Sequence, residues 1–95
     1  MSKEQIISAI DLGSDKCTTL IARVLPVKKL QVLGFAVVPS RGMKRSMIID
    51  LEQVLNTISQ SLDAAERMAG FSVKNAIVSI SGTHIRYKKD RKSVV

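Results

Sequence analysis

The stretch "AIDLGSDKCTTLIA", which runs from Ala9 to Ala22, places a short acidic break containing glycine between two runs rich in β-branched residues. Apolar runs that stop at Gly, Ser and Asp are typical of strands joined by a turn, because these residue types tolerate the dihedral angles of tight turns. The stretch therefore predicts two strands, at residues 5–11 and 17–25, joined by the loop at residues 11–16.

A third apolar run, "LQVLGFAVV" at residues 30–38, follows this hairpin and ends at Pro39. The connection between the second and third runs is the short turn "PVKK". Short connections between successive strands favour antiparallel neighbours. This part of the chain therefore predicts a three-stranded antiparallel meander.

A helical period replaces the strand pattern at residues 51–69. Asp50 is a suitable N-cap with Gln53 three residues later, and Gly70 stands where a left-handed C-terminal cap is favoured. The apolar residues at helical spacing are Leu51, Val54, Leu55, Ile58, Leu62, Ala65 and Met68 or Ala69. They form one stripe, which predicts an amphipathic helix packed on the sheet.

The segment "NAIVSISG" at residues 75–82 alternates apolar and small polar residues and predicts a fourth strand. It follows a strand-to-helix unit, so a right-handed crossover would place it parallel to one of the first three strands. The expected fold class is α/β with the order β-β-β-α-β: a three-stranded antiparallel meander plus one parallel strand, with a helix on one face. Residues 83–95 show no clear period apart from the terminal "SVV".

Length and composition restrict the kind of protein. The chain has 95 residues, 45% of them hydrophobic, which fits one small globular domain. No apolar run approaches the roughly 20 residues that span a bilayer, and the N-terminus lacks a signal-peptide pattern, so we expect a cytoplasmic chain without a membrane segment. Cys17 is the only cysteine, which excludes an internal disulfide and a cysteine-based zinc site.

The formal net charge of +7 suggests a nucleic-acid partner as one alternative. Most of this charge lies in "RYKKDRK", at residues 86–92, with five basic residues against one acidic residue. Single-strand binders combine such cations with aromatic stacking platforms, and this segment offers only Tyr87. We therefore predict no specific nucleic-acid binding and interpret the segment as a basic tail.

Most catalytic motifs are absent from the sequence. It contains no G-x-x-x-x-G-K-[ST] and no G-x-G-x-x-G, and His84 is its only histidine, so a nucleophilic triad is excluded and no catalytic residue is assigned. The loop at residues 11–16 is the remaining candidate site. A phosphate loop needs small residues for close approach and a cation, which Gly13, Ser14 and Lys16 would supply.

Asp11, at the end of the first strand, could hold Mg²⁺ through water, because Mg²⁺ keeps several waters and takes only one or two carboxylates. The residue types by themselves leave two interpretations open, an ordinary turn or a phosphate-binding loop, since D-x-G-S is common in turns.

Three motifs in a fixed order carry a family resemblance. "AIDLGSDKCTTLIA" is similar to the first phosphate motif of the actin-like ATPase superfamily, a β-hairpin with the pattern D-[LIF]-G-[TS]. The later stretches "VPSRGMKRSMIIDLEQVLNTISQSLDAAERMAG" and "VKNAIVSISGTHI" resemble the N-terminal part of the FtsA family of bacterial cell-division proteins. The resemblance runs over residues 6–86, nearly the whole chain.

This resemblance implies the first part of an ATP-binding lobe of the actin/ribonuclease H-like kind. Asp11 would correspond to the metal-side carboxylate, Gly13 and Ser14 to the turn that contacts phosphate, and Lys16 to a basic residue near the phosphates. The family binds ATP with Mg²⁺ between two lobes, forms actin-like polymers and tethers FtsZ filaments to the membrane through a C-terminal amphipathic helix. A location on the cytoplasmic face of the inner membrane, at the division septum, is implied with it.

The chain departs from the family pattern in three ways. Ser46 stands where the family usually has Gly, the segment after residue 86 differs from the family, and the later ATP-binding motifs and second lobe are missing. We therefore expect an incomplete lobe, with residues 1–82 as its N-terminal part and residues 83–95 as a basic tail at the truncated start of the inserted domain. We expect this chain to be neither catalytic nor able to hold ATP alone.

Other interpretations remain open. The chain could come from another actin-like ATPase of the pilus-assembly or chaperone type, which would share the first hairpin motif. It could also be a small basic nucleic-acid-binding module. A third alternative is an interaction module that presents unpaired strand edges to a partner.

Overall fold

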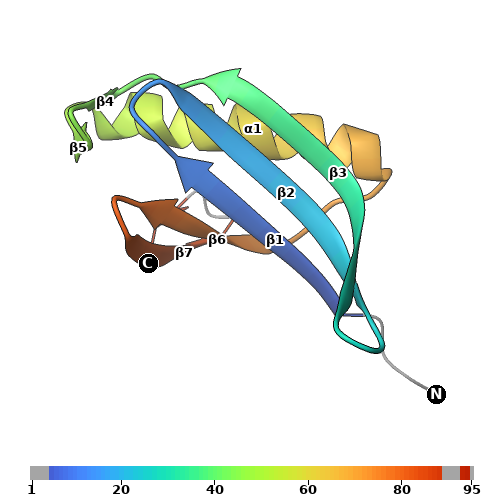
Figure 1. Cartoon of the computed structure of the whole chain (residues 1–95). Helices are drawn as coiled ribbons and strands as arrows, with labels where there is room; N and C mark the ends of the chain where they lie inside the picture. The colour runs from blue at the N-terminus through green and yellow to red at the C-terminus, as the bar shows by residue number, and fades with distance from the viewer. Residues whose placement is uncertain (1–4, 89–92, 95) are drawn as a thin grey trace.

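The first three strands form the predicted antiparallel meander (Figure 1). The computed structural model describes residues 5–88 and 93–94. Strands β1 (Gln5–Leu12), β2 (Lys16–Leu25) and β3 (Lys29–Pro39) pair in chain order, and the β1–β2 register runs from Gln5 opposite Val24 to Leu12 opposite Cys17. The prediction of a meander from the β-branched runs and their short connections is confirmed.

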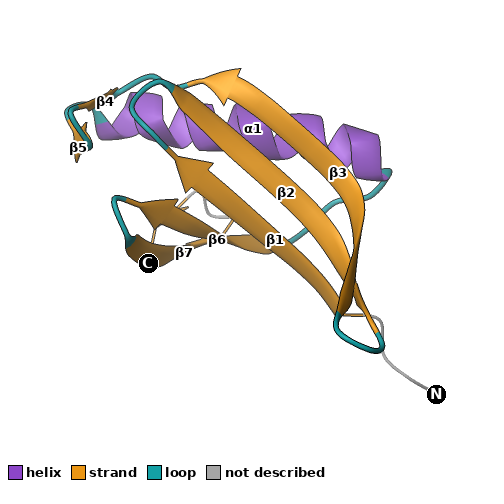
Figure 2. Cartoon of the chain, in the orientation of Figure 1, coloured by secondary structure: helices purple, strands orange, loops and turns teal. Residues whose placement is uncertain are grey.

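The helix α1 (Leu51–Ala69) has the predicted bounds and caps. The Asp50 side chain accepts a hydrogen bond from the Gln53 N–H at 3.2 Å. At the other end, Gly70 adopts a φ of 88° and its N–H donates to the Glu66 carbonyl at 2.8 Å. Figure 2 shows α1 running behind the meander, along one face of the sheet.

Strand β6 (Asn75–Ile80) pairs parallel to β1, as the crossover rule predicted. Two strands that were not predicted extend the sheet, β7 (Thr83–Lys88) and the short β8 (Ser93–Val94), giving the order β3-β2-β1-β6-β7-β8. The fold class is therefore the expected α/β arrangement, with an additional antiparallel hairpin after β6.

Strand β7 was missed because its alternation is weak. Among its six residues only Ile85 and Tyr87 are apolar or aromatic, and they alternate with His84 and Arg86. The turn before it, at Ser81 and Gly82, has positive φ at both residues, which is the geometry of a tight two-residue hairpin turn. Residues 89–92 and 95 of the predicted basic tail lie outside the described residues.

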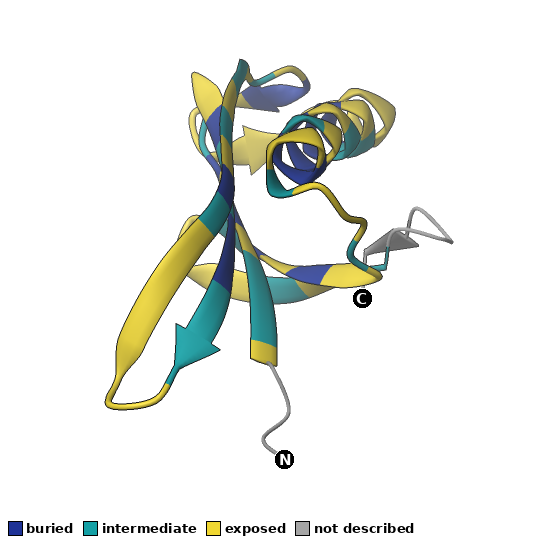
Figure 3. Ribbon diagram, turned by 90° about the vertical axis from the view of Figure 1, so that its right-hand side faces the viewer, coloured by how far each residue is buried: buried dark blue, intermediate teal, exposed yellow. Residues whose placement is uncertain are grey.

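The core lies between α1 and the face of the sheet that it covers (Figure 3). The fully buried side chains of this layer include Ile10, Ile21, Val54, Ile58, Leu62 and Val78. One polar pair lies among them: the hydroxyl groups of Thr19 on β2 and Ser61 on α1 are 2.5 Å apart, and both residues are buried. The predicted apolar stripe of the helix is thus the core-facing stripe in its central turns, while Leu51 and Met68 at its ends are exposed.

Gly34 sets how closely α1 approaches β3. A Cβ atom at this position would overlap the main-chain carbonyl oxygen of Ala65. Gly34 therefore allows a close approach of helix and strand backbones that no larger residue would permit without displacing one of them.

The opposite face of the sheet has no helix over it in the described residues. Apolar side chains on this face remain about half exposed, among them Leu30, Val32, Phe35 and Val37 of β3 and Ile77 of β6. We call this the helix-free face. Asp11, a residue of the predicted phosphate loop, lies on this face at the end of β1.

Candidate functional site

The predicted loop lies at the carboxyl end of β1. Asp11 is the penultimate residue of that strand and stands opposite Thr18 of β2 on one side and Ser79 of β6 on the other. Buried Ile10 and Leu12 flank Asp11, and because neighbouring strand residues point to opposite faces, Asp11 lies on the helix-free face, where it is exposed.

Gly13 closes the β1–β2 turn with a backbone hydrogen bond that the sequence did not predict. Its N–H donates to the Lys16 carbonyl at 3.0 Å, so this backbone donor is used inside the hairpin. Its φ lies outside the left-handed region, and an added Cβ would be 3.2 Å from the Lys16 carbonyl oxygen, a tight contact. Gly13 can therefore give an anion close access to the turn, but its own N–H already has a partner.

Two further loops converge on this turn. The Ser14 hydroxyl accepts a hydrogen bond from the Ser46 N–H at 2.9 Å, and the Ser46 carbonyl accepts one from the Ser81 hydroxyl at 3.1 Å. Ser40 adds a backbone hydrogen bond, from its N–H to the Asp15 carbonyl at 2.9 Å. The β1–β2 turn, the segment around Ser46 and the β6–β7 turn thus form one hydrogen-bonded cluster.

Ser46 belongs to a small hairpin made by β4 (Met43–Lys44) and β5 (Met47–Ile48). The apolar pattern of the sequence did not predict these two short strands. At the hairpin tip Arg45 and Ser46 have φ of 51° and 64°, a region that favours glycine, so the departure from the family's Gly puts a side chain in a left-handed conformation. Figure 1 shows this hairpin beside the β1–β2 turn.

A hollow of about 270 Å³ opens on the helix-free face next to Asp11. Its polar lining comes from Asp11, Thr18, Ser79 and His84, and its apolar lining from Ala9, Ile10, Leu20 and Ile77. His84 reaches this hollow because it stands opposite Ser79 in the β6–β7 pairing. The sequence did not indicate that His84 lies beside Asp11, because the alternation of β7 is weak and its pairing with β6 was not predicted.

Lys16 begins β2 and is exposed, opposite Pro39 in the β2–β3 pairing. The structure thus brings Asp11, Gly13, Ser14 and Lys16 together at one end of the sheet. The described residues contain no group of three or more His, Cys, Asp or Glu that could hold a metal ion by themselves. A Mg²⁺ ion held through water needs only one or two carboxylates, so Asp11 fits that kind of site when other ligands come from phosphate and water.

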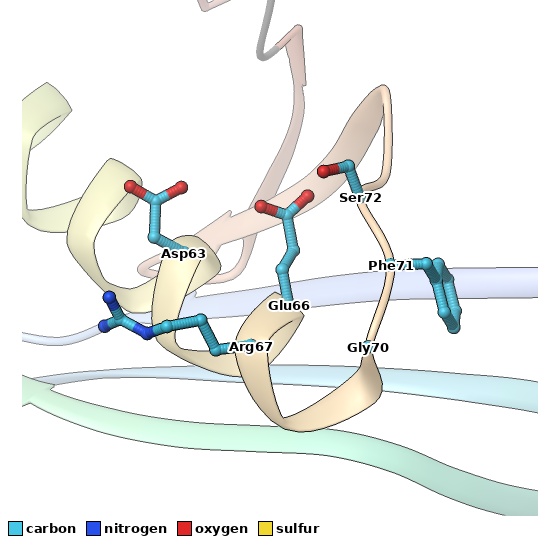
Figure 4. Close-up of a pocket in the computed structure, with 6 residues that line it drawn as sticks. All are labelled: Asp63, Glu66, Arg67, Gly70, Phe71 and Ser72. Atoms are coloured by element: carbon cyan, nitrogen blue, oxygen red, sulfur yellow. The ribbon is translucent and has the colours of Figure 1, made fainter.

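A second hollow, of about 410 Å³, lies at the far end of α1 (Figure 4). It is lined by Asp63, Glu66, Arg67, Gly70, Phe71 and Ser72. Glu66 accepts a hydrogen bond from the Val73 N–H at 2.6 Å and so ties the segment after the helix to its last turns. This hollow follows from the local chain path and is remote from the predicted loop.

Cys17 is fully buried at the start of β2, and burial raises the pKa of its thiol to about 11. The thiol is therefore protonated near neutral pH, which is unfavourable for a nucleophile. Cys17 therefore acts as a small buried hydrophobic residue.

Two solved structures share the fold of this chain. A ROK hexokinase from Thermus thermophilus matches with a TM-score of 0.57 and 20% identity over 78% of this chain and 21% of that one. A diol dehydratase-reactivating factor in nucleotide-free form matches with a TM-score of 0.59 and 21% identity over 80% of this chain and 12% of that one. The chain therefore has the fold of part of an actin/ribonuclease H-like lobe.

Sequence comparison identifies a particular group within that class. Proteins named cell division protein FtsA match this chain, with 34% identity over 82 residues in Pseudomonas aeruginosa, 32% over 85 in Bacillus subtilis and 31% over 81 in Escherichia coli K12. The chain is therefore similar to FtsA proteins over most of its own length, as its motifs predicted.

The matches cover 85–90% of this chain but span only 19–20% of the length of those FtsA proteins. No protein-family model matches the chain. Within the part of the chain that the structure describes, no helix has both the length and the apolar character needed to cross a membrane.

Proposed function

We propose that this chain forms the phosphate side of an ATP-binding lobe in an FtsA-like cell-division protein. One observation carries the proposal: Asp11, Gly13, Ser14 and Lys16 lie together where the parallel strands β1 and β6 both end. In open sheets of this kind, ligands bind beyond the carboxyl ends of the parallel strands. The FtsA relatives support this function over that of another actin-like ATPase.

Each residue would have a distinct role at this edge. Gly13 would let a phosphate group approach the turn, Ser14 would donate a hydrogen bond from its hydroxyl to a phosphate oxygen, and Lys16 would supply positive charge. Asp11 would hold Mg²⁺ through water from the helix-free side. Bound metal would neutralise phosphate charge and orient the nucleotide.

The remaining family properties concern a longer protein. In that setting the lobe would close over ATP, and the protein would form polymers and connect FtsZ filaments to the cytoplasmic face of the inner membrane. Positioning a nucleotide for phosphoryl transfer needs groups on several sides of the phosphates. We therefore propose that this chain by itself is not catalytic, and that residue 83 begins the family's inserted domain.

Site-resolved NMR of the 95-residue chain tests the phosphate role. We expect Mg-ATP to shift the backbone amides of residues 13–16 with millimolar affinity at low salt, since one exposed wall provides few contacts. The Lys16→Gln variant should bind about two- to fivefold more weakly, the size of one screened surface charge contact. Lys74→Gln is the matched control, because Lys74 precedes β6 at the opposite end of that strand.

Two results would contradict the proposal. Equal affinity of Lys16→Gln and Lys74→Gln would remove Lys16 from the site. Micromolar retention of Mg-ATP in equilibrium dialysis would show that this chain encloses nucleotide without a second lobe.

A second candidate is an interaction module. Strand β3 is an edge of the sheet, is 11 residues long, and carries apolar side chains that are half exposed on the helix-free face. Unpaired edges of this kind recruit another strand. For this candidate we propose a second copy of the chain as the partner. For nucleic-acid binding the described part of the basic segment adds no support, because Arg86 and Lys88 lie within β7.

A further inference from the structure

The β4–β5 hairpin reaches the phosphate turn through its own backbone. The Ser46 N–H donates to the Ser14 hydroxyl at 2.9 Å, although 32 residues separate them in the chain. We propose that this hairpin is a second wall of the anion site, with Arg45 and Lys44 as additional phosphate-binding residues. This inference rests on the proposed function, since it assigns the hairpin to the same ligand.

The position of the hairpin is determined by the protein itself. At its base the Gly42 carbonyl accepts hydrogen bonds from the Ile49 N–H at 2.8 Å and from the Asp50 N–H at 3.2 Å. A Cβ at Gly42 would overlap the Asp50 carbonyl oxygen, so the base packs tightly against the start of α1. At its tip the Ser81 hydroxyl holds the Ser46 carbonyl at 3.1 Å. The wall is therefore in place before a ligand binds.

The hydrogen bond from Ser46 also orients the Ser14 hydroxyl. A hydroxyl group can accept and donate at the same time. Here the Ser14 oxygen accepts from the Ser46 N–H, and this leaves its own proton for an acceptor. An anionic oxygen at the turn is such an acceptor, so the hairpin prepares Ser14 as a donor to phosphate.

The charges around the turn show why a second cationic wall is needed. The turn itself contains two carboxylates, Asp11 and Asp15, against one ammonium group, Lys16. Its formal charge is therefore negative, which disfavours an anion. Lys44 and Arg45, both exposed in the hairpin, reverse the sign of the local charge. The two basic residues thus make the turn able to attract phosphate even before a metal ion is added.

Arg45 is the better placed of the two basic residues. It directly precedes Ser46, whose N–H contacts the turn. It lies at the tip of the hairpin, where its φ is 51°. A guanidinium group offers a planar set of donors that matches a phosphate group in a bidentate way. Arg45 is therefore next to the residue that contacts the turn, and its guanidinium group can bind a phosphate group.

Inorganic pyrophosphate, added without metal to the 95-residue chain at low salt and followed by NMR, tests this inference. In the wild-type chain we expect amide shifts at residues 13–16 and at residues 44–46. Arg45→Gln should weaken binding about two- to fivefold, and Arg45→Lys should recover part of the loss. Arg67→Gln is the matched control, because it removes the same charge in the last turn of α1 and should leave affinity unchanged.

Lys44→Gln is a second variant, which removes a charge from β4 rather than from the tip of the β4–β5 hairpin. If residues 13–16 shift in the wild-type chain but Arg45→Gln and Lys44→Gln both bind as Arg67→Gln does, the hairpin inference is overturned while the phosphate role of the turn stands. If pyrophosphate shifts neither segment of the wild-type chain, the hairpin inference is overturned, and the Mg-ATP titration decides the phosphate role of the turn separately.

Discussion

At the scale of single residues, Gly34 and Gly13 show how differently two glycines can act. Gly34 is required because the Ala65 carbonyl of α1 occupies the space that a side chain would need. Gly13 has more room, with its nearest contact at 3.2 Å to the Lys16 carbonyl oxygen. The sequence suggested a role for Gly13 from its motif, whereas the role of Gly34 depends on Ala65 of α1, which lies 31 residues further along the chain.

Replacing Gly34 with Ala should destabilise the fold by about 2 kcal/mol or more, because the added methyl group must displace a strand or helix backbone. Urea unfolding of the two proteins would measure this difference. Gly82→Ala is the control: Gly82 has open space around it and a φ of 81°, so only backbone strain of about 1 kcal/mol is expected. A Gly34→Ala variant as stable as the control would contradict the tight helix–strand contact.

At the scale of secondary-structure elements, the helix and meander were predictable because their signals are local. Spacing of apolar residues, the Asp50 cap and the Gly70 cap all lie within or next to α1 itself. How α1 is attached to the sheet was not predictable from that pattern. The Thr19–Ser61 hydrogen bond joins residues 42 positions apart inside the core, where the apolar stripe would lead one to expect no polar contact.

This pair should behave as a coupled unit in a double-mutant cycle. Thr19→Val and Ser61→Ala should each destabilise the fold by about 1–3 kcal/mol, because each removes the hydrogen bond between the two buried hydroxyls, although Ser61 keeps a longer bond to the Cys17 carbonyl at 3.4 Å in Thr19→Val. The double variant should lose at least about 0.5 kcal/mol less than the sum of the singles. Thr18→Val, on the other face of β2, is a control for the change of side chain. Strict additivity of the two core substitutions would show that the hydroxyls do not interact.

At the scale of the whole molecule, the structure has one face covered by α1 and one helix-free face with half-exposed apolar side chains. The edge strand β3 extends this apolar surface to the border of the sheet. A surface of this kind favours contact with another chain or with further protein. The matched region makes up only 19–20% of the length of the FtsA proteins that resemble this chain, so in them most of the polypeptide lies outside it.

We expect the isolated chain to self-associate at high concentration through β3. Sedimentation velocity should show a concentration-dependent increase in mass for the wild-type chain, and Phe35→Lys should shift the chain towards monomer, because a charge on an edge strand opposes strand addition. Val27→Lys adds the same charge to an exposed apolar residue in the β2–β3 turn and should change association less. A wild-type chain that stays monomeric at all concentrations would argue against the interaction-module candidate.

The sequence alone determined the local elements and the residue types of the site. β-Branched runs, turn residues and capping residues act over a few positions, so the hairpin, the meander and the helix could be predicted, and the motif at residues 11–16 indicated phosphate chemistry. Only the tertiary structure decided what surrounds that motif. In the structure the Gly13 N–H is hydrogen-bonded within the turn, and His84 lines the hollow beside Asp11. Hydrogen bonds also connect Ser14 with Ser46 and Ser46 with Ser81. The Gly13 bond is local to the turn, but the other contacts join residues that are distant along the chain, and they form only when the sheet brings the three loops to one edge.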